Sequence, residues 1–260
     1  MTGTPADRLA AMLVAARREP RQIRGLPPEL VPATSADGYR VNAKVAEGLG
    51  WEPLGWKIAA TTPVMQQRLR TKEPIYGRTY ARFLMSPPVI LARAELLEPL
   101  IECEFFFRLG AALPARATPY TRDEVADAVA AVYAGVEIAE CRFPRDELPP
   151  ISAVLADGAA SGRYVLGPEI ANWRARDLAE MPVTLTVNGR VRREGRGADV
   201  MGHPLEPLVW LANERCKWGD GLAAGALVST GTATGMLLAE AGDVMEARYG
   251  ADIAIALTFS

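Results

Sequence analysis

Short β-rich segments, each bounded by glycine or proline, recur from about Trp56 onward and constrain the fold more than any other feature. Segments of this length and composition are typical of strands. They cover residues 55–60, 87–92, 99–110, 135–143, 163–167, 181–189, 225–231, 242–250 and 252–260. Many strands with few, irregularly placed helices indicate a strand-rich α+β body rather than a doubly wound parallel sheet. No Gly-x-Gly-x-x-Gly follows a strand and opens a helix, which argues against a dinucleotide-binding fold.

Helical patterns dominate the first fifty residues. One runs from Pro5 to about Arg18 and another from Ser35 to Gly48, with a proline-rich loop between them. We therefore expect an N-terminal helical part over residues 1–54 and a β-rich catalytic domain over residues 55–260. Three further helices are expected at 62–69, at 121–133, where a Thr-x-x-Glu capping box begins the helix, and at 204–219. The polar segment 70–82 shows no strand pattern and is expected to supply any lid.

Composition excludes several functional classes. The chain has 260 residues, 49% of them hydrophobic and 23% charged, and its net charge of −2 leaves no basic footprint for nucleic acid or for a membrane surface. The three cysteines, Cys103, Cys141 and Cys216, form no CxxC pair, so they indicate neither a zinc site nor a disulfide framework. The start of the chain has no basic region before its short apolar run, and no span approaches the length of a membrane helix. These features predict a cytoplasmic protein.

Two glutamates stand in the most apolar strand segment, 99–107. In a strand, Ile101, Cys103 and Phe105 point one way, while Glu102 and Glu104 point the other way, roughly 6.5–7 Å apart. Carboxylates side by side in a poorly solvated site repel each other unless a cation lies between them. A solvent-facing strand edge with two scattered acids is the alternative that this segment alone leaves open.

A third glutamate favours the metal site. In segment 134–140, Val136 and Ile138 face one side and Glu137 the other, beside the small residues Gly135 and Ala139. Three carboxylates without a histidine select a hard ion, Mg²⁺ or Mn²⁺ rather than Zn²⁺. The chain's one histidine precedes a proline at a helix start, where a structural or capping role is expected.

Two other segments supply candidate site residues. Lys57 stands opposite the buried Trp56 and Ile58, and beside a metal its pKa would fall, making it a usable proton shuttle; a surface lysine is the alternative. The Gly- and Thr-rich stretch 229–235 is expected to form a turn that offers Thr230, Thr232 and backbone N–H groups to a substrate carboxylate. It lacks the lysine that a phosphate loop requires.

These motifs, in this order and spacing, resemble the 2-oxopent-4-enoate hydratase and 4-oxalocrotonate decarboxylase branch of the fumarylacetoacetate hydrolase superfamily. The resemblance runs from roughly Gly38 to the C-terminus. It rests on GWKI at 55–58, EPIYG at 73–77, IECEF at 101–105, VEIAE at 136–140, AD at 156–157, GHPL at 202–205, WLAN at 210–213 and the loop at 229–235.

The resemblance implies a function and a fold. Glu102, Glu104 and Glu137 would bind Mg²⁺ or Mn²⁺, the ion would be chelated by a small 2-oxo acid, and Lys57 would match the family's active-site lysine. The fold implied is a mixed β-sandwich roll of the family's C-terminal type with an N-terminal helical part, and members form homo-oligomers. The implied reaction is metal-dependent hydration of 2-hydroxy-2,4-dienoates in aromatic or related ring breakdown.

The sequence departs from the family pattern near the substrate. Arg82 stands five residues after Gly77, where the hydratases usually carry an aspartate. The family's Asp-Asn-Ala-Ser stretch reads Asp157-Gly-Ala-Ala, followed by Ser161. We expect Arg82, Asp157 and Ser161 to contact the substrate. The departures keep three alternatives open, namely a decarboxylase of 2-oxo-3-enedioates, a hydrolase of acylpyruvates, and a non-catalytic homologue.

Overall fold

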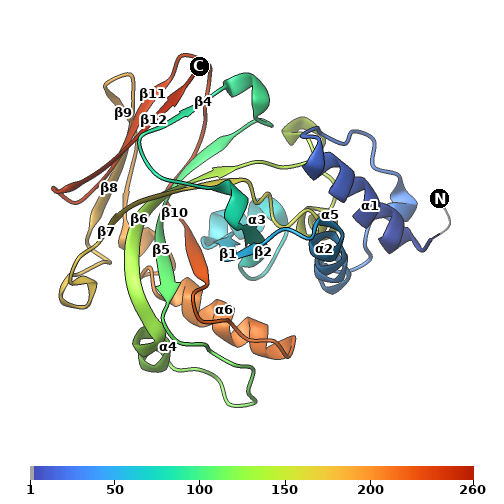
Figure 1. The fold of residues 1–260 in the computed structure, drawn as a ribbon, viewed down its shortest axis with the longest axis horizontal. Helices are drawn as coiled ribbons and strands as arrows, with labels where there is room; N and C mark the ends of the chain where they lie inside the picture. The colour runs from blue at the N-terminus through green and yellow to red at the C-terminus, as the bar shows by residue number, and fades with distance from the viewer. Residues whose placement is uncertain (1–2) are drawn as a thin grey trace.

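The computed structural model describes residues 3–260, and its N-terminal helices form where the sequence provides helix starts. Helix α1 (Pro5–Arg18) begins at a capping box in which Thr4 accepts a hydrogen bond from the Asp7 N–H. Helix α2 (Ser35–Leu49) begins at Thr34 in the same way, and it ends at Gly50 in the left-handed conformation. Both helices lie at one end of the molecule, beside the short α5 (Ile151–Ala156) (Figure 1).

The larger sheet has seven strands in the order β2-β1-β10-β5-β6-β7-β3. It mixes parallel and antiparallel neighbours, since β1 pairs with β10 and β3 with β7 in parallel, whereas β5 is antiparallel to both β10 and β6. Its strands are β1 (Pro53–Ala59), β2 (Ile75–Tyr80), β3 (Leu84–Met85), β5 (Leu100–Leu109), β6 (Val129–Ala139), β7 (Arg163–Glu169) and β10 (Leu227–Leu238).

The smaller sheet has five strands in the order β4-β12-β11-β8-β9. Hairpin β8–β9 turns at Asn188 and Gly189, both with positive φ, which is the usual chemistry of a tight two-residue turn. The strands are β4 (Val89–Leu91), β8 (Pro182–Val187), β9 (Arg190–Arg196), β11 (Val244–Tyr249) and β12 (Ile253–Phe259).

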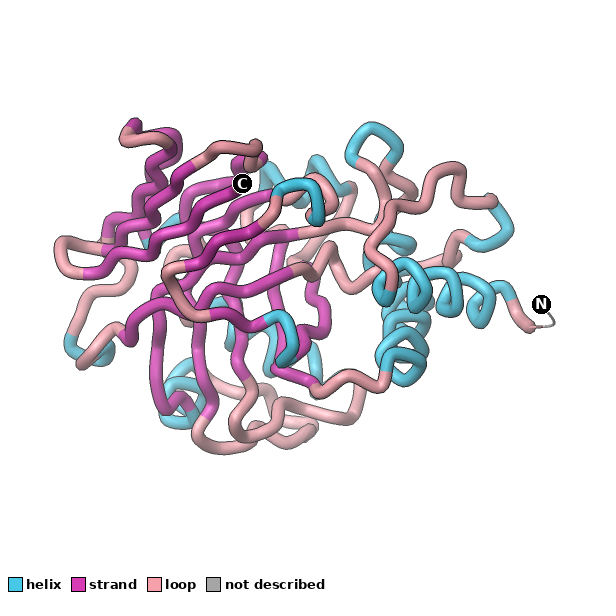
Figure 2. The backbone as a smooth tube through the Cα atoms, turned by 45° about the horizontal axis from the view of Figure 1, so that its top comes forward, coloured by secondary structure: helices cyan, strands magenta, loops and turns pink. Residues whose placement is uncertain are grey.

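The two sheets pack against each other over a shared apolar core, to which β5 contributes Ile101, Cys103, Phe105 and Phe107. The strands occupy one side of the molecule and the N-terminal helices the other (Figure 2). Tyr249 of β11 donates from its hydroxyl to the Gly135 carbonyl oxygen at 2.6 Å, which fastens the smaller sheet to β6. The other face of β5, bearing Glu102 and Glu104, therefore looks away from the sandwich core.

The remaining helices join or flank the strands. They are α3 (Pro63–Leu69), α4 (Arg122–Ala128), α6 (Glu206–Lys217) and the 3-10 turns at 28–30, 81–83, 93–95, 145–147, 173–175 and 197–199. Within the described residues no helix is long and apolar enough to span a membrane. The expected α+β class, a strand-rich mixed sandwich with a helical N-terminal part, is confirmed. The boundary at residue 54 stays a prediction, and β1 begins at Pro53.

Three local expectations were wrong. The helix expected over 121–133 ends at Ala128, because Val129 already pairs with Leu109 of β5 and begins β6. Residues 75–80, expected within a polar lid, form β2 and pair with β1. The stretch 229–235, expected as a turn, belongs to β10, whose pairing with β5 shifts register twice there.

Candidate metal centre and adjoining cavity

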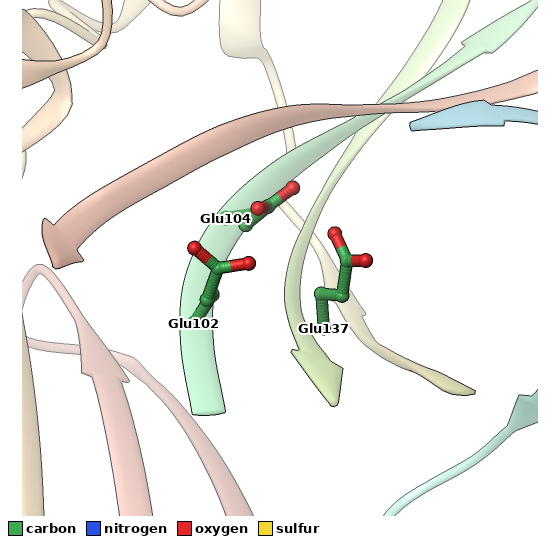
Figure 3. A group of neighbouring side chains, drawn as sticks. All are labelled: Glu102, Glu104 and Glu137. Atoms are coloured by element: carbon green, nitrogen blue, oxygen red, sulfur yellow. The ribbon is translucent and has the colours of Figure 1, made fainter. Parts of the chain in front are cut away.

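Three glutamate side chains converge on one point on the concave face of the larger sheet. Glu102 and Glu104 extend from β5 and Glu137 from β6, and their carboxylates turn toward one another (Figure 3). One oxygen of each lies within 4.8 Å of the others, and all three side chains are buried. Glu102 pairs directly with Glu137 in the β5–β6 register, while Glu104 pairs with Gly135. The alternation of β5 therefore does place Glu102 and Glu104 on one face.

The three carboxylates lack the counter-charge and the hydrogen bonds that buried acids need. Burial raises the pKa of all three; that of Glu137 rises to about 7, and that of Glu104 rises well above its ordinary value because Glu137 and Glu102 repel its charge as well. Glu104 Oε1 and Glu137 Oε2 have no hydrogen-bond partner. Oxygen atoms that are buried, unpartnered and directed at one point suit a divalent cation, so these residues fit the ion expected from the sequence.

Lys57 of β1 completes the polar cluster. Its side chain is 2% exposed; its Nζ lies 3.2 Å from Glu137 Oε1 and donates to the Ala159 carbonyl oxygen at 2.9 Å. Strand β1 is separated from β6 by β10 and β5, so the contact requires a strongly curled sheet. Burial lowers the pKa of Lys57, but the carboxylates outweigh it, chiefly Glu137, and the net direction is upward. The lowering expected from the sequence was for a lysine beside a metal ion, so it stays a prediction.

Two groups that sequence reasoning missed support the carboxylates, namely the Tyr164 side chain at Glu137 and the Gly231 backbone N–H at Glu104. The Tyr164 hydroxyl donates to Glu137 Oε1 at 3.4 Å and lies 2.8 Å from Ser161 Oγ. Tyr164 is paired across the strands with Glu137. It stands in segment 163–167, which the sequence identifies only as a strand, and nothing local reveals the register. Gly231 N–H donates to Glu104 Oε2 at 3.1 Å, from a residue with φ of +90°.

A cavity of about 1080 Å³ opens beside the carboxylates. Lys57, Glu102 and Thr232 line it, so the predicted metal, lysine and loop residues do come together. Its remaining lining includes four arginines, namely Arg68, Arg145, Arg192 and Arg193. Arg193 is held by its Nε, which donates to the Met236 carbonyl oxygen at 3.1 Å. The lining also contains the acids Glu194, Asp199, Glu240 and Asp243, so its charge is mixed. The cavity has room for a small organic acid beside the carboxylate cluster.

Three of the predicted substrate contacts lie elsewhere. Asp157 is fully buried, with Oδ1 3.0 Å from Arg142 Nε and 3.1 Å from Arg17 Nη2. The Arg82 guanidinium stacks 4.4 Å from the Trp51 ring centroid and lines a separate, smaller cavity. Ser161 lines that smaller cavity too, although its hydroxyl reaches Tyr164. The positions of Asp157, Arg82 and Ser161 in the structure therefore do not support direct contact with the substrate.

Thr230 and His203 also have defined places. Thr230 is fully buried and does not line the larger cavity, unlike Thr232. His203 Nδ1 accepts a hydrogen bond from the Leu205 N–H at 3.0 Å in the turn before α6, which is a structural role; α6 itself has no side-chain cap.

A curled mixed sheet that carries three buried, converging carboxylates defines this chain as an α+β protein with a candidate site for a hard cation. Residues 63–256 match the family model described as fumarylacetoacetate (FAA) hydrolase, C-terminal. The 2-keto-4-pentenoate hydratase of Paraburkholderia xenovorans (strain LB400) is 30% identical over 249 residues, 95% of this chain and 91% of the relative. The chain belongs to the fumarylacetoacetate hydrolase family, as the sequence motifs predicted.

Relatives with a second activity are equally similar. The 4-oxalocrotonate decarboxylase of Pseudomonas sp. (strain CF600) is 30% identical over 219 residues, 83% of this chain and 82% of the relative. A solved structure of 4-oxalocrotonate decarboxylase from Pseudomonas putida G7, complexed with magnesium and adipate, is 27% identical. It has a TM-score of 0.90 and covers 100% of this chain and 99% of that chain. The fold is therefore that of the family.

Proposed function

We propose that this enzyme of the fumarylacetoacetate hydrolase family is a divalent-metal-dependent hydratase that adds water to 2-hydroxy-2,4-dienoates. The observation that carries the proposal is the group of three buried, under-bonded carboxylates with Lys57 beside them at a cavity of small-acid size. The hydratase relative aligned over 95% of the chain supports the choice of reaction. The proposed ion is Mg²⁺ or Mn²⁺, and Mg²⁺ is favoured by the decarboxylase complex.

The residues of the site have different roles in the proposed reaction. Glu102, Glu104 and Glu137 would hold the ion, which supplies Lewis-acid stabilisation of negative charge on a 2-oxo acid. Lys57 keeps its ammonium group at Glu137 and within the cavity wall, where it is placed to give a proton to the carbon that is protonated when the dienol is converted to the 2-oxo form. Tyr164 fixes Glu137 through its hydroxyl. Leu100, Ala139 and Leu237 give the cavity an apolar side that limits water near the reacting carbons.

Decarboxylation of a 2-oxo-3-enedioate is the second candidate, because one observation favours it. Arg68, Arg145, Arg192 and Arg193 line the cavity, and guanidinium groups recognise carboxylates well. A substrate with a second carboxylate would find a partner there. Both reactions pass through the same enolate, so the metal site alone does not separate them.

One assay separates the candidates. Purified protein is incubated with Mg²⁺ and a panel of 2-hydroxy-dienoates, 2-oxo-3-enedioates and acylpyruvates, while substrate absorbance and released CO₂ are both followed. Loss of absorbance without CO₂ identifies the hydratase, and CO₂ release identifies the decarboxylase. Turnover of acylpyruvates alone would indicate the hydrolase, and silence across all three classes would contradict the proposal and favour a non-catalytic homologue.

Two further properties are proposed on the strength of the family resemblance. We propose that the enzyme is a homo-oligomer and that it acts in the cytoplasm. Light scattering coupled to size-exclusion chromatography tests the first, since a monomer mass of 28.0 kDa would contradict it.

A further inference from the structure

A second cavity, of about 260 Å³, lies between the C-terminal end of α1 and the chain that follows β2 and β6. It shares no lining residue with the larger cavity beside the carboxylates. The chain after β6 divides the two, since Cys141 lines the larger cavity, whereas its neighbours Glu140 and Arg142 line the smaller one. The smaller cavity is therefore a separate space, with chemistry of its own.

Positive charge dominates this smaller cavity. Its lining contains five arginines, namely Arg17, Arg18, Arg82, Arg142 and Arg163. Two carboxylates form ion pairs with three of these arginines: Glu140 pairs with Arg163, and Asp157 pairs with both Arg17 and Arg142. Within residues 3–260, Arg18 and Arg82 form no ion pair. Five guanidinium groups thus meet two carboxylates.

The buried Arg17 guanidinium also has an N–H donor without a hydrogen-bond acceptor. The residue is 6% exposed, and its Nε has no hydrogen-bond partner. Burial and the nearby Arg142 both lower its pKa, which reports a cation held in an unfavourable place. A buried donor with no acceptor costs free energy that an incoming anion would recover.

Two arginines of the smaller cavity, Arg82 and Arg163, lie against aromatic rings. The Arg82 guanidinium lies 4.4 Å from the Trp51 ring centroid and 5.5 Å from that of Phe83. Arg163 approaches Phe83 from 5.9 Å. Stacking on aromatic rings orients a guanidinium without consuming its N–H donors, so Arg82, which forms no ion pair in the described residues, remains available to an oxyanion, whereas Arg163 also pairs with Glu140.

We propose that this cavity is a binding site for a small oxyanion, either inorganic phosphate or the carboxylate of a small organic acid. The volume admits an ion of that size and not a nucleotide. Arg82, which the sequence suggested as a contact of the substrate, belongs to this site. The proposal does not depend on the proposed reaction, because no residue of the carboxylate cluster lines the cavity.

Isothermal titration calorimetry on the metal-free protein tests the proposal with inorganic phosphate and, separately, with acetate. We expect one site per chain, and Arg82→Gln should weaken binding roughly tenfold, as for the loss of one charge-assisted contact. Arg82 is exposed, so this variant should fold. Arg190→Gln is the matched control, because Arg190 is exposed and lines neither cavity, and it should leave the affinity unchanged.

Two outcomes would overturn the inference. The first is that neither anion binds the wild-type protein at millimolar concentration. The second is that Arg82→Gln binds the anion as tightly as the wild type does. Tighter binding of phosphate than of acetate identifies the inorganic ion as the ligand, and the reverse order identifies an organic acid. Either order supports the site.

Discussion

Glu102 and Glu137 lie directly opposite each other on β5 and β6, with both carboxylates buried. Like charges in this arrangement destabilise an antiparallel pair, and burial adds to the penalty. Within residues 3–260, Lys57 is the one basic side chain that forms an ion pair with the cluster. One ammonium group does not balance three carboxylates, and this imbalance is the physical reason for proposing a divalent cation between them.

Glu104→Gln should weaken Mg²⁺ binding at least about 100-fold, because it removes a charged ligand from the centre of the cluster. Metal-dependent turnover should be lost with it. The metal-free variant should be at least as stable as the wild type, since a repelling charge is gone. Calorimetric titration with Mg²⁺ measures the affinity, and Glu240→Gln, an exposed acid that lines the larger cavity, is the control. Wild-type affinity in Glu104→Gln would remove that residue from the site.

Stabilisation by Mg²⁺ should grow as the pH rises from about 5 to about 8. The pKa of Glu137 is raised to about 7 in the folded chain, and that of Glu104 is also raised, so protons occupy the ligands at acid pH. Because the pKa of these carboxyl groups is higher in the folded than in the unfolded chain, they contribute to the free energy of unfolding of the metal-free protein at pH values below their ordinary pKa. This contribution is lost as the pH rises through the pKa of the folded chain. The Tm difference with and without Mg²⁺ checks this; a larger difference at acid pH would count against it.

Lys57→Met should reduce kcat by about 10²- to 10⁴-fold, the range for loss of a positioned proton-transfer group. Mg²⁺ affinity should be retained or increased, because the substitution removes a cation 3.2 Å from a proposed ligand. This separation of kcat from metal affinity distinguishes proton transfer from metal binding. Steady-state kinetics with calorimetry measures both, and the exposed Lys44→Met is the control. Unchanged kcat would exclude Lys57 from the chemistry.

Asp157→Asn should destabilise the fold by about 3–5 kcal/mol, because it leaves buried Arg17 and Arg142 without their carboxylate. The variant's KM should stay near that of the wild type, since Asp157 does not line the larger cavity. Asp146→Asn, which breaks an exposed pair with Arg24, should change stability by less than about 1 kcal/mol. Urea unfolding measures both. A changed KM with unchanged stability would restore Asp157 as a substrate contact.

The part of the site that follows from local pattern was predictable. The two-residue period of strand 99–107 places Glu102 and Glu104 on one face, whatever the sheet around them. The absence of histidine beside them selects a hard ion. Glu137 lies beside these two residues because of the register between β5 and β6, which the sequence does not reveal. The sequence prediction of Glu137 rested instead on its small neighbours and on the family resemblance.

Other features depend on contacts that no local pattern records. Strand β9 is charged and exposed along its length, so it lacks the apolar alternation that identifies strands, and it forms because the Asn188–Gly189 turn returns the chain against β8. Tyr164 reaches Glu137 only through sheet pairing. Arg82 shows the opposite limit, because the family resemblance suggested a substrate contact, whereas its guanidinium stacks on Trp51 at a different cavity, which does not support that contact.

Anomalous diffraction from crystals soaked with Mn²⁺ tests the central claim most directly. The account predicts one strong anomalous peak per chain between Glu102, Glu104 and Glu137, at about 2.0–2.3 Å from one oxygen of each. The peak should disappear in Glu104→Gln crystals treated identically. A wild-type map with no peak between these carboxylates, or with its principal peak elsewhere, would contradict the metal site and the function proposed from it.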